Sequence, residues 1–147
     1  MREVEEATLP EQVGVLIKET QSVLHQRMDE VLRPLGLTVP QYACLETLWD
    51  SPGITAAELA RRAFVSRQSM NVVLQGLEKR GLIERSEEPG PQRERATVLR
   101  VSAVRLRARA HGEVARVVGS MTADLDAAEV ARLLTLLTTC RDALRAE

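Results

Sequence analysis

The chain has 147 residues, a length that suits one compact domain. Hydrophobic residues make up 44% of it and aromatic residues only 2%, so the core must be aliphatic, and the net charge is −1. No apolar run approaches the roughly 20 residues that a membrane span needs, and the acidic N-terminal segment lacks the apolar centre of a signal peptide. These features exclude a membrane protein and predict a cytoplasmic one.

The first predicted element is a long helix over residues 10–35. Pro10 suits its first turn, and Pro34 and Gly36 mark its end. A helix of about 24 residues is longer than the core of one small domain needs, so we expect it to pack against a partner chain. Its apolar residues recur at helical spacing: Val13, Leu16, Ile17, Leu24, Met28, Val31, Leu32 and Leu35.

Two capping boxes follow, each with a Thr and an acid or amide three residues later. The first, Thr38 to Gln41, opens a helix that ends at residues 51–53. The second, Thr55 to Glu58, opens a short helix that reaches about residue 62. The apolar spacing of the first of these helices predicts that it turns Tyr42, Leu45, Leu48 and Trp49 towards the core.

A turn at Phe64 and Val65 leads to a further helix that Ser66 caps and Gly81 ends. Its predicted buried face consists of Met70, Val73, Leu74 and Leu77. Residues 82–85 and 97–101 then predict two strands of a hairpin whose tip contains residues 88–91. This order of elements is that of a helix-turn-helix followed by a wing.

Two helices are predicted after the hairpin. The first covers about residues 102–121, and Asp126 with Glu129 forms the capping box of the second. One side of the last helix carries Val130, Leu133, Leu134, Leu137 and Leu144. The predicted fold is therefore mainly α, with a small antiparallel β-wing.

Several short motifs of the central segment match those of a known family. They are Gly36-Leu37-Thr38, Ser51-Pro52-Gly53, Glu58-Leu59-Ala60, Val65-Ser66-Arg67-Gln68, Leu77-Glu78-Lys79-Arg80-Gly81-Leu82-Ile83 and Glu84-Arg85. With these motifs the segment resembles the MarR family of transcription regulators. The resemblance implies one MarR-like domain over residues 1–147, in which residues 38–102 form a winged helix-turn-helix lobe. It also implies an obligate homodimer built from the long N- and C-terminal helices, residues 10–35 and 103–147, with each lobe binding half of a palindromic operator.

The chain departs from the family pattern in and after the wing. The family's Asp-x-Arg is here Arg93-Glu94-Arg95, so the Arg carries over to Arg95 and the Asp that orients it is missing. Glu94 and Glu84 are the candidates to replace that Asp. The family's Thr-x-x-Gly after the wing is here residues 102–105, in which Ser102 keeps the capability to cap and the Gly is absent.

Charge and residue type point to the same segment as the DNA-binding surface. Residues 55–110 contain twelve Arg or Lys and six Asp or Glu, a net charge of +6, whereas the remainder carries −7. Arg can pair with guanine, Gln and Asn with adenine, and Val with the thymine methyl group, while Ser suits phosphate. The predicted DNA-binding residues are Ser66, Arg67, Gln68, Ser69, Asn71, Val72 and Gln75 on the recognition helix, Arg93 and Arg95 in the wing, and Arg61 and Arg62 beside the backbone. The alternative is a solvated helix face with capping serines.

The resemblance also implies a pocket for a small aromatic or phenolic effector. The candidate lining residues are His25, Met28, Tyr42, Leu45 and Trp49. His25 as a surface residue and Trp49 as a core residue are the alternatives. Cys44 and Cys140 match no metal or redox spacing, so we interpret both as small apolar residues on helix faces.

The sequence shows no catalytic constellation, no metal-binding spacing and no cofactor motif, so we predict neither an enzyme nor a cofactor. The favoured function is a homodimeric, sequence-specific DNA-binding transcription regulator. We predict a repressor that a small molecule releases from its operator. The alternative is a winged-helix module that binds proteins and not DNA, a possibility that the departures in the wing leave open.

Overall fold

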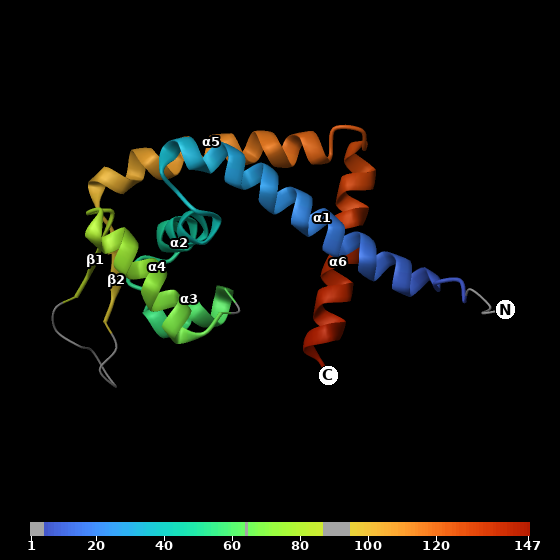
Figure 1. The fold of residues 1–147 in the computed structure, drawn as a ribbon, viewed down its shortest axis with the longest axis horizontal. Helices are drawn as coiled ribbons and strands as arrows, with labels where there is room; N and C mark the ends of the chain where they lie inside the picture. The colour runs from blue at the N-terminus through green and yellow to red at the C-terminus, as the bar shows by residue number, and fades with distance from the viewer. Residues whose placement is uncertain (1–4, 64, 87–94) are drawn as a thin grey trace. The chain divides into compact units, whose positions relative to one another are not determined.

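The computed structural model describes residues 5–63, 65–86 and 95–147 (Figure 1). Its elements, in chain order, are α1 (Leu9–Leu32), the 3-10 turn η1 (Arg33–Leu35), α2 (Val39–Asp50), α3 (Ala56–Ala63), α4 (Arg67–Lys79), β1 (Ile83–Arg85), β2 (Thr97–Leu99), α5 (Val101–Met121) and α6 (Ala127–Arg145). The mainly helical fold with an antiparallel wing is as predicted. The chain divides into two compact units, Met1–Val114 and Ala115–Glu147.

Side-chain caps fix where the helices begin. Thr8 caps α1 in a box with Glu11, a cap that the sequence analysis missed, and Thr38 caps α2 in the predicted box with Gln41. The last predicted turn of the first helix is the separate 3-10 turn η1. It ends at Gly36, whose φ of 72° is left-handed and favours glycine.

The core of the first unit is aliphatic and lies under the helix-turn-helix. Its fully buried side chains come from α1, α2, α3, α4 and β1, so α4 is anchored by one face. Val73, predicted to be buried, is only partly so. The members are Leu32, Leu45, Leu48, Leu59, Leu74, Leu77 and Ile83, each less than 2% exposed.

Trp49 does not belong to this core, which corrects the prediction made for it. Its side chain is 47% exposed, and the Arg107 guanidinium of α5 stacks on its ring at 4.3 Å from the centroid. Arg107 also donates to both carboxylate oxygens of Glu46 at 3.1 Å. Burial and the neighbouring Glu46 carboxylate raise the pKa of Tyr42 to about 12. A polar cluster therefore joins α2 to the start of α5.

The wing is joined to the turn between α2 and α3. β1 and β2 pair antiparallel with Ile83 opposite Leu99 and Arg85 opposite Thr97. The Gly53 N–H donates to the Thr97 carbonyl, and the Thr97 N–H donates to the Ile54 carbonyl, each at 3.0 Å. The predicted hairpin is confirmed for these strands, although its tip at residues 88–91 lies outside the described ranges.

Ser102 does not cap the helix after the wing, which corrects the sequence analysis. α5 begins at Val101, so the predicted returning strand is also shorter than expected. The Ser102 hydroxyl lies inside the first turn and donates to the Gly81 carbonyl at 2.9 Å. It therefore ties the end of the recognition-helix segment to α5.

In the second unit, Asp126 and Glu129 form the predicted capping box of α6. Several leucines of α6 are exposed, including Leu134 at 69% and Leu144 at 76%. Within the described ranges, no helix has the length and apolar character required to cross a bilayer.

Candidate DNA-binding surface

The predicted recognition helix α4 is amphipathic. Met70, Leu74 and Leu77 are buried on its inner face. Six of the predicted DNA-binding residues lie on the rest of the surface of this helix, away from its buried side chains. Of these, Arg67, Gln68, Ser69, Val72 and Gln75 are exposed, and Asn71 is partly buried.

Ser66, one of the predicted DNA-binding residues, is the N-cap of α4. Its hydroxyl oxygen accepts from the Ser69 N–H at 3.0 Å, and the hydroxyl donates to Ser69 Oγ at 2.9 Å. The single donor of the hydroxyl and one of its two acceptor sites are thus used inside the helix end.

We expect Ser66→Ala to lower the free energy of unfolding by about 1 kcal/mol, because the substitution removes the cap of α4. Urea unfolding followed by circular dichroism at one protein concentration measures this loss. The control is Ser120→Ala, which removes an exposed hydroxyl bonded to the Arg116 carbonyl within α5. Equal stabilities of the two variants would contradict the capping role.

Arg61 and Arg62 are exposed on α3, as their predicted role requires. Both form ion pairs with Glu58, and Arg62 Nη1 also donates to Ser51 Oγ at 3.1 Å. Exposed pairs of this kind contribute little to stability, so DNA phosphates can compete for these guanidinium groups.

Within the described part of the wing, a backbone carbonyl holds the arginine Arg95. Its Nε donates to the Ser86 carbonyl at 2.6 Å. Glu84 is one of the two candidates to orient Arg95. Its Oε2 instead lies 3.9 Å from Nε of Arg100. Arg93 and the other candidate, Glu94, lie outside the described residues.

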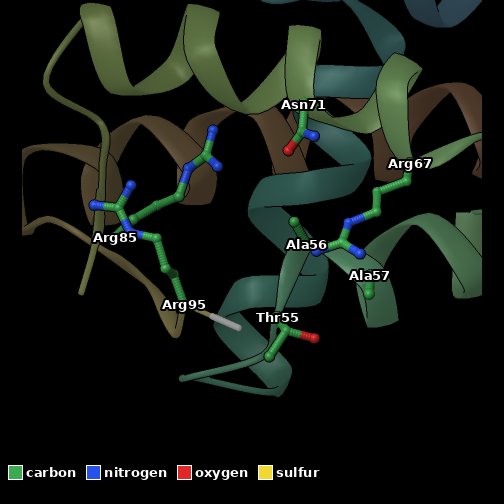
Figure 2. Close-up of a pocket in the computed structure, with 7 residues that line it drawn as sticks. All are labelled: Thr55, Ala56, Ala57, Arg67, Asn71, Arg85 and Arg95. Carbon is green, nitrogen blue, oxygen red and sulfur yellow. The ribbon is translucent and has the colours of Figure 1, made fainter. Parts of the chain in front are cut away.

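A pocket of about 180 Å³ lies between α4, the start of α3 and the wing (Figure 2). The described residues that line this pocket include three arginines and no acid. Arg85 is the functional candidate that the sequence analysis missed. Alternation along β1 could have found it, because Arg85 lies on the same side of the strand as the buried Ile83. The lining residues are Thr55, Ala56, Ala57, Arg67, Asn71, Arg85 and Arg95.

A second, larger pocket of about 610 Å³ is lined by residues of α1, α2, α3 and α4. His25, one of the five residues predicted to line an effector pocket, lines it, and so do Gln21, Cys44, Arg62, Ser69 and Met70. The other four predicted residues do not line this pocket. Tyr42 and Leu45 are buried in the core, Met28 packs against that core, and Trp49 lines a different hollow beside Pro52 and Val98.

Cys44 is a buried thiol at the wall of this larger pocket. Its Sγ lies 3.3 Å from Sδ of Met70, and burial raises its pKa to about 11. Within the described residues, no group of three or more His, Cys, Asp and Glu is placed to hold a metal ion.

We expect the Cys44 thiol to react slowly with a disulfide reagent at pH 8. A pKa of about 11 leaves a thiolate fraction about 100-fold below that of an ordinary cysteine, since the thiolate is the nucleophile. Reaction of a Cys140→Ser variant with Ellman's reagent, against the same variant unfolded in urea, measures the difference. Equal rates would show that Cys44 is accessible in the folded chain.

Known proteins share this architecture. The MarR family profile matches residues 35–94. The HTH-type transcriptional repressor Rv2887 of Mycobacterium tuberculosis is 38% identical over 115 residues, which cover 76% of this chain and 83% of the repressor. The structure of Rv2887 in complex with DNA matches over 90% of this chain and 98% of the Rv2887 chain, with 35% identity and a TM-score of 0.71.

Two further structures extend this similarity. Rv2887 in complex with p-aminosalicylic acid has 34% identity, a TM-score of 0.71 and coverage of 91% of this chain and 98% of its own. A MarR-family transcriptional regulator from Rhodococcus sp. RHA1 has the same fold, with a TM-score of 0.82, 20% identity and coverage of 92% and 96%. The fold and the winged lobe agree with those of these relatives, and the repressor Rv2887 is 38% identical over 76% of this chain. The chain therefore belongs to the MarR family of transcription regulators.

Proposed function

We propose that this protein is a homodimeric, sequence-specific DNA-binding transcription regulator that acts as a repressor. The observation that carries the proposal is the outward face of α4, where polar side chains able to contact base edges lie on a segment with a net charge of +6. The relative Rv2887 is a transcriptional repressor with a DNA-bound structure, which supports the same role here.

The proposed division of labour follows the chain. Residues 38–102 form the DNA-binding lobe, and residues 10–35 and 103–147 form the dimer. Exposed apolar side chains on the long helices support the dimer, since a face of this kind is stable in water when a partner covers it. They include Val13, Leu16 and Ile17 on α1 and Leu134, Leu137 and Leu144 on α6.

In this proposal α4 enters the major groove of each half-site. The base edges are contacted by four residues of α4: Gln68, Asn71, Val72 and Gln75. Ser69 and Arg67 contact the DNA backbone. Arg61 and Arg62 follow the phosphates, and the wing arginines Arg93 and Arg95 lie at the neighbouring minor groove. Two recognition helices about 34–36 Å apart would match successive turns of a palindromic operator.

The pocket lined by His25 is the proposed effector site. Its volume of about 610 Å³ suits a small aromatic or phenolic molecule, and the apolar part of its wall is contributed by Val39, Leu59 and Val73. The p-aminosalicylic acid complex of Rv2887 supports a ligand of this class. Because Ser69 and Arg62 belong to both this wall and the DNA-binding face, a ligand that favours one arrangement of α3 and α4 would change the DNA affinity.

The test is binding of the purified protein to the DNA immediately upstream of its own gene at two salt concentrations. Tight, sequence-selective binding saturated by one dimer, with affinity that falls steeply as salt rises, is the expected result. Absence of binding to this DNA and to an unrelated duplex would overturn the proposal and favour the protein-interaction module.

A further inference from the structure

The smaller pocket concentrates positive charge that no carboxylate of its wall neutralises. Arg67, Arg85 and Arg95 all line it, and its described lining contains no Asp or Glu. Three guanidinium groups around one hollow favour an anion, because Arg presents N–H donors in a planar fork that matches an oxyanion.

Arg85 carries an unsatisfied donor at this site. Its side chain is only 13% exposed, and its Nε lies 3.4 Å from Oε2 of Glu78. That contact lacks hydrogen-bond geometry, so Nε is a buried donor without an acceptor among the described residues. A buried polar group in this state favours a ligand that supplies the acceptor.

The start of α3 forms part of the same wall. Thr55 Oγ1 accepts from the Glu58 N–H at 3.3 Å, which satisfies one of the free N–H groups of the first turn. Ala56 and Ala57, the first two residues of α3, line the pocket. The positive end of the helix dipole therefore acts on whatever occupies it.

Size and position identify the anion. A volume of about 180 Å³ is below the roughly 300–1,000 Å³ of pockets that enclose organic ligands, but it accommodates a phosphate group. The pocket lies beside the outward face of α4, because Arg67 and Asn71 stand on the first turns of that helix. Figure 2 shows Arg67 extending from α4 towards Ala56 and Ala57 at the start of α3.

We infer that this pocket binds one phosphate of the DNA backbone in each half-site, with Arg67 and Arg85 as its main ligands. Arg67 then anchors α4 to the backbone and does not distinguish bases, and sequence recognition falls to its neighbours on α4. The inference rests on the proposed function and adds Arg85 and the start of α3 to the DNA contacts.

The experiment measures binding of the full-length dimer to a selected operator fragment and to a mixed-sequence duplex over a range of salt. Arg67→Gln is the first variant because Arg67 is exposed and its loss does not disturb the core. We expect its salt slope, the change of log K with log salt, to fall by about 0.9 per lost phosphate contact, or about 1.8 for the two pockets of a dimer. Both DNAs should weaken by the same factor, so that the specificity ratio stays unchanged.

Arg33→Gln is the matched control, because it removes the same charge from an exposed residue at the end of α1 whose partner is Asp29. We expect its slope to equal that of the wild type. Arg85→Gln should reproduce the effect of Arg67→Gln, and its circular dichroism spectrum and melting temperature establish that it is folded. If only Arg85→Gln fails to fold, Arg67→Gln alone decides.

Two results would overturn the inference while leaving the proposed function intact. One is a loss confined to the operator fragment with an unchanged slope, which would assign Arg67 to a base. The other is an unchanged slope together with a shift of the arginine N–H resonances of wild-type protein by inorganic phosphate, which would assign the pocket to a free anion. Failure of the wild type to bind either DNA would instead refute the proposed function.

Discussion

Leu74→Ala is expected to lower the free energy of unfolding by about 2–5 kcal/mol. Leu74 is fully buried on the inner face of α4, within a cluster that also includes Leu45 and Leu77. Truncation removes apolar contacts and leaves a cavity that the surrounding core relaxes only partly to fill. Since small proteins have a total stability of roughly 5–15 kcal/mol, this is a large share. Urea unfolding at one fixed protein concentration measures it, because a dimer's stability depends on concentration.

Val72→Ala on the same helix is the matched control. Val72 is 66% exposed on the outward face, two residues from Leu74. We expect the free energy of unfolding of this variant to stay within about 0.5 kcal/mol of the wild-type value, because surface truncations seldom lower it by more. Its DNA affinity should fall if it contacts a thymine methyl group. Similar stability losses in both variants would mean that α4 is not anchored by the face that the structure assigns to it.

Local chemistry explains why much of this fold could be predicted. The capping boxes at Thr38 and Asp126 and the cap at Ser66 are decided by residues three positions apart, so the sequence pattern contains all the partners. The inner and outer faces of α4 follow from helical spacing in the same way. Both kinds of information are confined to one turn or one helix.

The errors concern contacts between distant residues. Helical spacing placed Trp49 in the core, but an arginine 58 positions later, Arg107, gives the ring a cation to stack on at the surface. Ser102 was expected to cap its own helix, yet its hydroxyl bonds to Gly81 in another segment. The assignment of Glu84 to Arg95 failed for the same reason, because Arg100 is its partner across the sheet.

The pocket walls were the least predictable part. His25 lines a pocket, whereas Tyr42 and Leu45 are buried in the core, which is the other place that the sequence analysis gave them. A helix facing both a core and a cavity shows one apolar stripe, so spacing alone does not separate the two. The wing arginine Arg85 was overlooked because its role depends on α3 and α4 lying beside the strand.

Gln68→Ala is expected to cause a large loss in operator affinity with no change in folding. Gln68 is exposed on the first turn of α4, and its amide can bond both N6 and N7 of one adenine. Such a pair is worth about 1–3 kcal/mol, and a palindrome contains two, so the affinity should fall by roughly 30-fold to 10⁴-fold. Fluorescence anisotropy with the selected operator fragment measures the loss.

The salt dependence separates this loss from the one expected at the phosphate pocket. Gln68 carries no charge, so its removal should leave the salt slope and the affinity for mixed-sequence DNA unchanged, and the specificity ratio should fall. Gln26→Ala, the same chemical change at an exposed position of α1, should alter neither quantity. If Gln68→Ala weakened both DNAs equally, Gln68 would be a backbone contact. Base recognition would then have to lie further along α4, at Val72 and Gln75, and α4 would enter the groove by its second turn.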